Sequence, residues 1–156
     1  MSLRTGKAGS RVALVKTAYD HGGSDPLPKF LTVEEVLYLH QRLIRDHGGE
    51  YGLRDPGLLE SAVAQPAMTA FGRLLHPTIP DQAGAYLFHL AMGHAFLDGN
   101  KRIGLHAALV FLTTNGWTVG GTADDWYELT MAVAAGTLRK AAATARIATL
   151  IGPQVL

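Results

Sequence analysis

Residues 81–114 read DQAGAYLFHLAMGHAFLDGNKRIGLHAALVFLTT, with two apolar segments on either side of a short polar one. In the first segment, apolar side chains recur with the spacing of one helix face, at Tyr86, Leu87, Leu90 and Ala91. The pattern predicts one helix from about Asp81 to Gly93 and another over 100–114. A connector over 95–99 joins these two helices, which we expect to lie at the centre of the fold.

Start and stop signals of further helices lie on both sides of this stretch. Thr32 and Glu35 have the spacing of a capping box, in which each side chain accepts a hydrogen bond from the other residue's N–H. Asp55-Pro56 combines an N-cap with a residue suited to the first turn. The proline-rich residues 66–80 are expected to form a mobile or hairpin-like connection. The further predicted helices are 32–48, 55–66, 122–136 and 138–150. The sequence therefore predicts an all-α fold, a compact bundle of six helices.

The periodic part of the chain defines the expected domain organisation. A single folded domain should span residues 31–152, followed by a tail over 153–156. Residues 1–30 lack a clear period and are predicted as an N-terminal extension with a short strand near 11–16. The opening Met1–Leu3 is either native or an added expression leader.

The composition excludes several classes of protein. Of the 156 residues, 47% are hydrophobic and 17% are charged, so extended disorder is not expected. The formal net charge of +1 is too small for general attraction to nucleic acid or to an anionic membrane. No apolar run reaches the ~18 residues of a membrane span, and no signal peptide is recognisable. Together with the absence of cysteine, these features favour a cytoplasmic protein that binds neither nucleic acid nor membrane.

The polar segment His94–Arg102, HAFLDGNKR, is where we expect the chemistry of the chain. It leads into the predicted helix 100–114, whose free N–H groups and dipole favour a bound phosphate. Gly99 gives the backbone the freedom to surround an anion. Lys101 and Arg102 add full positive charges. Because two cations at a helix start oppose the helix dipole, a bound anion explains them better than solvent does.

Three further residues complete the predicted site. Asp98 lies beside these cations, a position that Mg²⁺ would explain, because Mg²⁺ is commonly held by one or two carboxylates together with phosphate oxygens. His94 can accept a proton from an attacking hydroxyl, because histidine changes its charge near neutral pH. Phe96 is expected to anchor the loop in the core.

Each part of this pattern also has an ordinary structural interpretation. Asp98-Gly99-Asn100 alone would be a turn with an N-cap, and Lys101-Arg102 alone would be a solvated helix start. The other histidines are expected to face solvent or to be satisfied within the core; they are His21, His40, His47, His76, His89 and His106. Only the combination of an acid, a histidine and two cations at one helix start argues for a phosphate site.

The segment resembles the signature of the Fic/Doc family, H-x-F-x-(D/E)-G-N-(G/K)-R, at every position. The resemblance continues through residues 31–36, 48–61 and 109–116, and it covers about residues 31–152. It implies a compact helical fold of the Fic/Doc type, with the active-site loop between two central helices. It also implies an enzyme that uses a nucleotide to modify a protein hydroxyl.

The family's residue roles transfer to the matching positions of this chain. The resemblance implies that His94 is the general base and that Asp98 binds Mg²⁺ and organises the phosphate site. It implies ATP as the nucleotide. Four residues would hold the phosphates: Gly99 and Asn100 as an anion cradle, and Lys101 and Arg102 as a clamp.

Two positions make the chain similar to the death-on-curing (Doc) branch of the family. Lys101 stands where the AMP-transferring members usually have glycine, and Leu105 stands where they usually have a second arginine. This similarity implies a toxin that transfers the γ-phosphoryl group of ATP to a Thr or Ser hydroxyl, with elongation factor Tu as the expected target. AMP transfer stays open, because some members of the branch have alanine at the position of Gly99. A non-catalytic module that only binds a partner is the second alternative.

The resemblance also indicates how such a toxin is restrained. The family's internal inhibitory pattern, (S/T)-x-x-x-E-(G/N), does not occur, because no glutamate has Ser or Thr four residues earlier. A separate antitoxin chain is therefore the expected partner, as a helical peptide in a groove near the site. Residues 66–80 match the position of the family's flap, which can hold a segment of the target by main-chain pairing.

Overall fold

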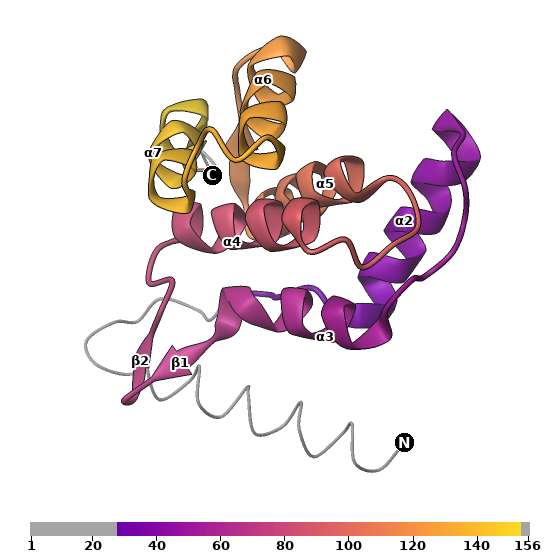
Figure 1. The fold of residues 1–156 in the computed structure, drawn as a ribbon. Coiled ribbons are helices and arrows are strands. Elements are labelled where there is room, and N and C mark those ends of the chain that lie inside the picture. Colours follow the sequence, from indigo (N-terminus) through magenta and orange to yellow (C-terminus); the bar gives the residue numbers. More distant parts are fainter. Residues whose placement is uncertain (1–27, 154–156) are drawn as a thin grey trace.

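The computed structural model describes residues 28–153. The strand predicted near 11–16, nearly all of the predicted extension and the end of the tail therefore lie outside the described residues. Six α-helices make up most of the described part (Figure 1). They are α2 (Val33–His47), α3 (Pro56–Ala64), α4 (Ile79–Met92), α5 (Asn100–Thr114), α6 (Ala123–Ala134) and α7 (Lys140–Leu150). The predicted all-α bundle is confirmed.

Threonine side chains fix where α2, α4 and α6 begin. The capping box predicted at Thr32 is present. A second one, formed by Thr78 and Asp81, starts α4 at Ile79, about two residues before the predicted start. The prediction assigned Pro80 to the preceding connection. Proline is nevertheless accepted in the first turn of a helix, because the N–H that it lacks would have no partner within the helix.

Short strands occur at two places in the described part. The connection after α3 contains the 3-10 turn η1 (Gln65–Ala67) and an antiparallel hairpin of β1 (Thr69–Ala70) and β2 (Arg73–Leu74). This confirms the hairpin-like form predicted for that segment. A second antiparallel pair, β3 (Trp117–Val119) with β4 (Ile151–Pro153), was not predicted. It ties the chain after α5 to the chain after α7.

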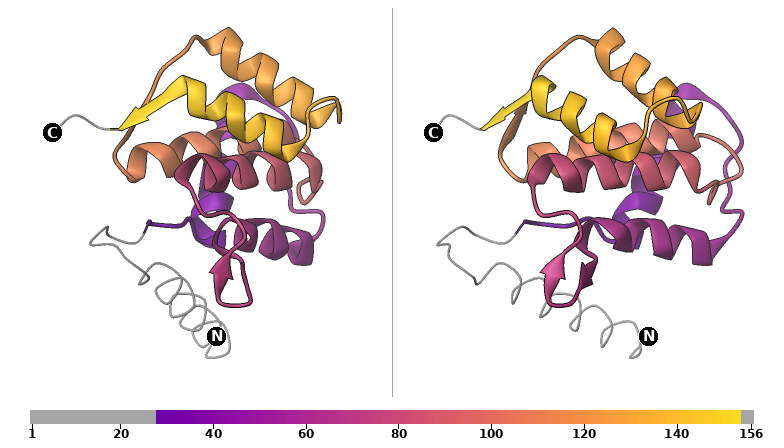
Figure 2. Two further views of the ribbon diagram at one scale, coloured as in Figure 1. Left: turned by 90° about the vertical axis from the view of Figure 1, so that its left-hand side faces the viewer. Right: turned by 60° about the vertical axis from the view of Figure 1, so that its left-hand side comes forward.

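The helices α4 and α5 form the centre of the fold. In Figures 1 and 2, α6 and α7 cover one side of this pair, and α2 and α3 lie on the other side. The predicted core residues of α4 are buried, and its Tyr86 packs against Phe111 of α5 with ring centroids 5.1 Å apart. Between residues 28 and 153, none of the helices has the length and apolar content needed to cross a membrane.

The two central helices approach closely at Gly104 of α5. A Cβ atom at this position would lie 2.9 Å from the carbonyl oxygen of Leu87 and 3.0 Å from the main-chain nitrogen of Ala91. Side chains do not normally come so close to main-chain atoms. The absence of a side chain at Gly104 therefore sets the separation of α4 and α5.

Replacing Gly104 tests this packing. We expect Gly104→Val to lower the free energy of unfolding by about 1–3 kcal/mol, because α4 and α5 must move apart to admit the side chain. Gly152→Val is the matched control, since a Cβ atom at Gly152 would meet no other atom within 4 Å. Chemical denaturation measures both variants, and equal stabilities would contradict the assignment.

A histidine joins the central layer to α7. The Nζ atom of Lys140 lies 3.1 Å from Nε2 of His89. Because an ammonium group can only donate, this nitrogen of His89 must accept, and the ring is therefore neutral. Burial, then the charges of Lys140 and His76, lower the pKa of His89 to about 4.

This lowered pKa makes stability depend on pH. Between pH 6.5 and about 4, an unfolded chain binds a proton at residue 89 that the folded chain does not bind, so stability should fall as the pH is lowered through this range. Lys140→Met should raise the pKa of His89 and weaken this dependence. An NMR titration of His89 and unfolding curves at pH 7 and pH 5 measure both effects. Arg139→Met, at the preceding position, is the control, and an unchanged His89 titration in Lys140→Met would contradict the argument.

Candidate active site

The segment predicted as the site forms an exposed loop between α4 and α5, here called the catalytic loop (residues 93–99). Its first side chain, His94, is exposed and has a left-handed backbone with φ of 52°. Such a conformation is uncommon for a residue other than glycine. Phe96 is only 2% exposed, the placement expected of an anchor, whereas Asp98 is exposed. The loop thus turns one aromatic ring into the core and its polar side chains outward.

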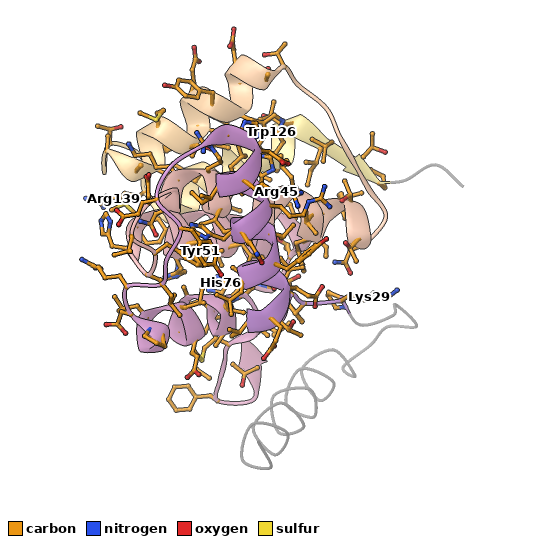
Figure 3. All side chains as sticks on the ribbon, turned by 90° about the vertical axis from the view of Figure 1, so that its right-hand side faces the viewer. Lys29, Arg45, Tyr51, His76, Trp126 and Arg139 are labelled. Carbon is orange, nitrogen blue, oxygen red and sulfur yellow. The ribbon has the colours of Figure 1, made fainter. Side chains whose placement is uncertain are left out.

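The chain between α2 and α3, here called the bracing segment (residues 48–55), runs antiparallel to the catalytic loop. Main-chain hydrogen bonds join the two: the N–H of Leu97 donates to the carbonyl of Gly52 at 3.0 Å. The N–H groups of Arg54 and Asp55 both donate to the carbonyl of Ala95, at 2.8 and 3.0 Å. Figure 3 looks onto this face of the molecule, with Tyr51 labelled on the bracing segment.

Side chains close the loop from both ends. The guanidinium of Arg54 donates from Nε to the carbonyl of His94 at 2.9 Å. Asn100, the first residue of α5, accepts from the N–H of Phe96 with Oδ1 and donates to the carbonyl of Phe96 with Nδ2, both at 3.0 Å. The side chain of Asn100 is therefore used to hold the loop. Only its main-chain N–H is available for the anion cradle in which the sequence interpretation placed it.

Asp98 is held by main-chain donors on both oxygens of its carboxylate. Oδ1 accepts from the N–H of Gly99 at 2.8 Å, and Oδ2 accepts from the N–H of Glu50 at 3.1 Å. The hydrogen bond from Glu50, then that from Gly99, and more weakly the charge of Arg102, hold the pKa of Asp98 below its ordinary value. The carboxylate is therefore ionised at neutral pH, and it remains open to solvent.

The start of α5 differs from the starts of α2, α4 and α6. Its N-cap is Gly99, in a left-handed conformation with φ of 75°, and no side chain caps the helix. The N–H groups of its first turn therefore have no partner within the helix. Lys101 is exposed at this end, and Arg102 is partly buried with Nη1 at 3.4 Å from the carbonyl of Gly48. The predicted phosphate residues are thus gathered around one uncapped helix start.

Two side chains that contact the loop, those of Arg54 and His40, are absent from the predicted site. His40 of α2 is 1% exposed, and its ring stacks on Phe96 with centroids 3.7 Å apart. Its Nε2 atom lies 2.8 Å from the carbonyl oxygen of Asp98. The sequence predicts only an ordinary histidine at this position, exposed to solvent or satisfied within the core. The available signal was its place on the buried face of α2, four residues after Val36 and four before Ile44.

Removing the side chain of Asn100 tests how the loop is closed. We expect Asn100→Ala to lower the free energy of unfolding by about 1–3 kcal/mol, because both hydrogen bonds to the main chain of Phe96 are lost. Amide exchange at Phe96, measured by NMR, should become faster. Lys101→Ala, at the next position, changes an exposed side chain and should leave the exchange at Phe96 unaltered. A similar exchange rate in both variants would show that Asn100 does not hold the loop.

Comparisons with known proteins agree with this geometry. The family model described as Fic/DOC family matches residues 30–112, which include the catalytic loop and most of α5. A protein named Toxin Doc, from Mycolicibacterium smegmatis, is 49% identical over 69 residues, which are 44% of this chain and 53% of that protein. The chain thus spans about half the length of this relative. A protein named Protein kinase doc, from Escherichia phage P1, is 33% identical over 113 residues, which are 70% of this chain and 86% of that protein. The chain therefore belongs to the Fic/Doc family, in the branch of the Doc proteins.

Proposed function

We propose that this protein is the toxin of a toxin–antitoxin pair and that it transfers the γ-phosphoryl group of ATP to a Thr or Ser hydroxyl of a target protein. The observation that carries the proposal is the uncapped start of α5, with two cations on its first turn and His94 and Asp98 on the loop before it. The names of the two relatives, a toxin and a protein kinase, support it.

His94 is the proposed general base. The oxygen of the acceptor hydroxyl attacks the γ-phosphorus, and its proton passes to the imidazole of His94. The bond between the γ-phosphorus and the bridging oxygen breaks, and ADP leaves with the electron pair. Proton transfer to a positioned side chain is worth about 10²–10⁴-fold in rate. The exposure of His94 leaves its ring accessible to a protein substrate.

The phosphates of ATP would bind at the start of α5. The free N–H groups of the first turn and the charges of Lys101 and Arg102 all favour anionic oxygens. Phosphoryl transfer depends mainly on positioning and on charge stabilisation, so a cationic cradle of this kind suits the reaction.

Asp98 fits a role as the protein ligand of Mg²⁺. Its carboxylate is exposed, its pKa is lowered, and each oxygen receives one hydrogen bond, which leaves further lone pairs for a metal. Residues 28–153 contain no cluster of three or more His, Asp or Glu side chains that could hold a metal ion. Mg²⁺ would therefore also need water and phosphate ligands, which is its usual habit. When bound, it would neutralise charge on the phosphate oxygens.

Two observations favour phosphoryl transfer over AMP transfer. Lys101 adds length and charge at a position where the AMP-transferring members of the family usually have glycine. Leu105 leaves the second turn of α5 without the additional arginine of those enzymes. AMP transfer remains the alternative product, and the mass of the modified target distinguishes the two.

The target and the antitoxin would use different parts of the surface. We propose elongation factor Tu as the target, which places the reaction in the cytoplasm, with the β1–β2 hairpin holding a segment of it. Phe71, at the tip of this hairpin, is fully exposed. We assign the antitoxin peptide to a pocket of about 290 Å³ between the first half of α2 and the end of α5. The pocket is lined by Leu31, Glu34, Glu35, Tyr38, Leu39 and Val110.

The proposal is tested with the purified chain, elongation factor Tu, Mg²⁺ and ATP. Intact-mass measurement of the target should show a gain of about 80 Da for a phosphoryl group, whereas AMP transfer would add about 329 Da. His94→Ala should lower the rate by about 10²–10⁴-fold while remaining folded. His47→Ala, which removes an exposed histidine from α2, should keep the full rate. Wild-type rates in His94→Ala would contradict the proposed base, and an unmodified target would contradict elongation factor Tu as the acceptor.

A further inference from the structure

His40 is a buried polar residue for which the proposed reaction has no direct use. It lies beneath the catalytic loop, with Nε2 at 2.8 Å from the carbonyl oxygen of Asp98 and with its ring stacked on Phe96 at an interplanar angle of 12°. Its other nitrogen, Nδ1, is buried without a hydrogen-bond partner. Leaving a polar atom unpaired in the core has a cost. A residue that carries this cost needs an explanation beyond packing.

The partners of His40 define its protonation. A carbonyl oxygen can only accept, so Nε2 must carry the hydrogen and donate it to Asp98. A second proton on Nδ1 would place a buried donor, and a charge, where no acceptor exists. Burial accordingly lowers the pKa of His40, against weaker opposing effects of the Asp98 carbonyl and carboxylate. The residue is therefore a neutral donor with a fixed tautomer.

The hydrogen bond from His40 holds the peptide that joins Asp98 to Gly99. On the other side of this peptide, the N–H of Gly99 donates to the Asp98 carboxylate at 2.8 Å. Glycine allows such a peptide to rotate at little steric cost. Rotation would turn the Asp98 carbonyl away from His40 and break the bond to the carboxylate. A carbonyl oxygen turned toward the start of α5 would repel the phosphate expected there.

The same histidine also limits the space around this peptide. A Cβ atom at residue 99 would lie 3.2 Å from Cδ1 of Ile44 and 3.4 Å from Nε2 of His40. These two side chains of α2 therefore form the surface on which Gly99 rests. Gly99 therefore gives the loop a flexible hinge, and the side chains of α2 that pack against Gly99 restrain it.

We infer that His40 is a positioning residue that keeps the Asp98–Gly99 peptide in the orientation that leaves the start of α5 open to phosphate. The ligand named here, the phosphates of ATP, rests on the proposed function. The orientation of the Asp98–Gly99 peptide does not rest on the proposed function, because it can be measured on the protein alone.

Two substitutions separate the hydrogen bond of His40 from its packing. His40→Phe keeps a flat ring that can stack on Phe96 but removes the donor. His40→Gln keeps an N–H near the position of Nε2 but removes the ring. If the donor is what matters, the amide of Gly99 should exchange about tenfold faster in His40→Phe than in the wild type, the factor expected for one lost hydrogen bond. In His40→Gln it should stay near the wild-type rate.

Steady-state kinetics distinguish positioning from a general loss of structure. His40→Phe should raise the KM for ATP about tenfold and leave the KM for the target protein unchanged, because only the phosphate site is disturbed. A merely structural role would reduce the fraction of active enzyme, which lowers kcat and moves neither KM. His40→Gln should restore the KM for ATP. His89→Phe is the control. The side chain of His89 pairs with Lys140 of α7 and not with the loop, so this substitution should leave the KM for ATP unchanged.

The exchange measurement and the kinetic measurement test different claims. A wild-type protein that transfers nothing from ATP to any acceptor would contradict the proposed function, and the exchange rates of Gly99 would still decide the role of His40. Equal exchange of Gly99 in the wild type and in His40→Phe would overturn the inference. Faster exchange in His40→Gln alone would overturn it too, because stacking would then be the interaction that holds the loop.

Discussion

The main-chain hydrogen bonds between the bracing segment and the catalytic loop are the constraint on which the site depends. They fix a loop that would otherwise have many conformations, since each such bond contributes about 0.5–1.5 kcal/mol net and an unpaired buried carbonyl costs more. Because the backbone, Asn100 and the Asp98 carboxylate hold the loop, the side chains of His94 and Lys101 do not have to. His94 and Lys101 are both exposed. The fold thus separates the groups that fix the loop from the groups that can reach a substrate.

The charges at the start of α5 oppose the stability of the helix. The first turns of α2, α4 and α6 carry acidic residues, which suit the positive end of the helix dipole, whereas those of α3, α5 and α7 carry none. In α5 the first turn carries two cations, Lys101 and Arg102, directly after the polar loop. A charge of the wrong sign there costs about 0.3–1 kcal/mol, and a glycine N-cap in place of Ser, Thr, Asp or Asn costs roughly a few tenths of a kcal/mol more. A bound anion would turn both costs into favourable interactions. Stability given up at one position and recovered on binding is typical of functional sites.

The features that could be predicted from the sequence are those that depend on residues close together in the chain. Caps and apolar periodicity predicted six helices and placed the start of α2, because these signals act within a few residues. The site residues were found because they are adjacent in the chain. The contacts that hold the site were not predicted, since Gly52 and Leu97, or His40 and Asp98, are joined only by the tertiary fold. Periodicity indicates that the position of His40 is buried, but it does not identify the group that its ring will meet. The pairing of β3 with β4 was missed for the same reason.

The position of Asp98 depends on two nearby glycines, which have no side chain, as much as on hydrogen bonds. Gly49, with φ of 115°, lies so close that a Cβ atom there would be 2.7 Å from Oδ2 of Asp98. Gly99 provides the left-handed turn on the other side. Glycines on both sides let the carboxylate reach two main-chain donors, but they also leave the backbone free to rotate. A flexible hinge at a site that must bind an anion in one geometry needs a restraint from outside the loop. The side chains that α2 presents to Gly99, Ile44 and His40, are in position to supply it.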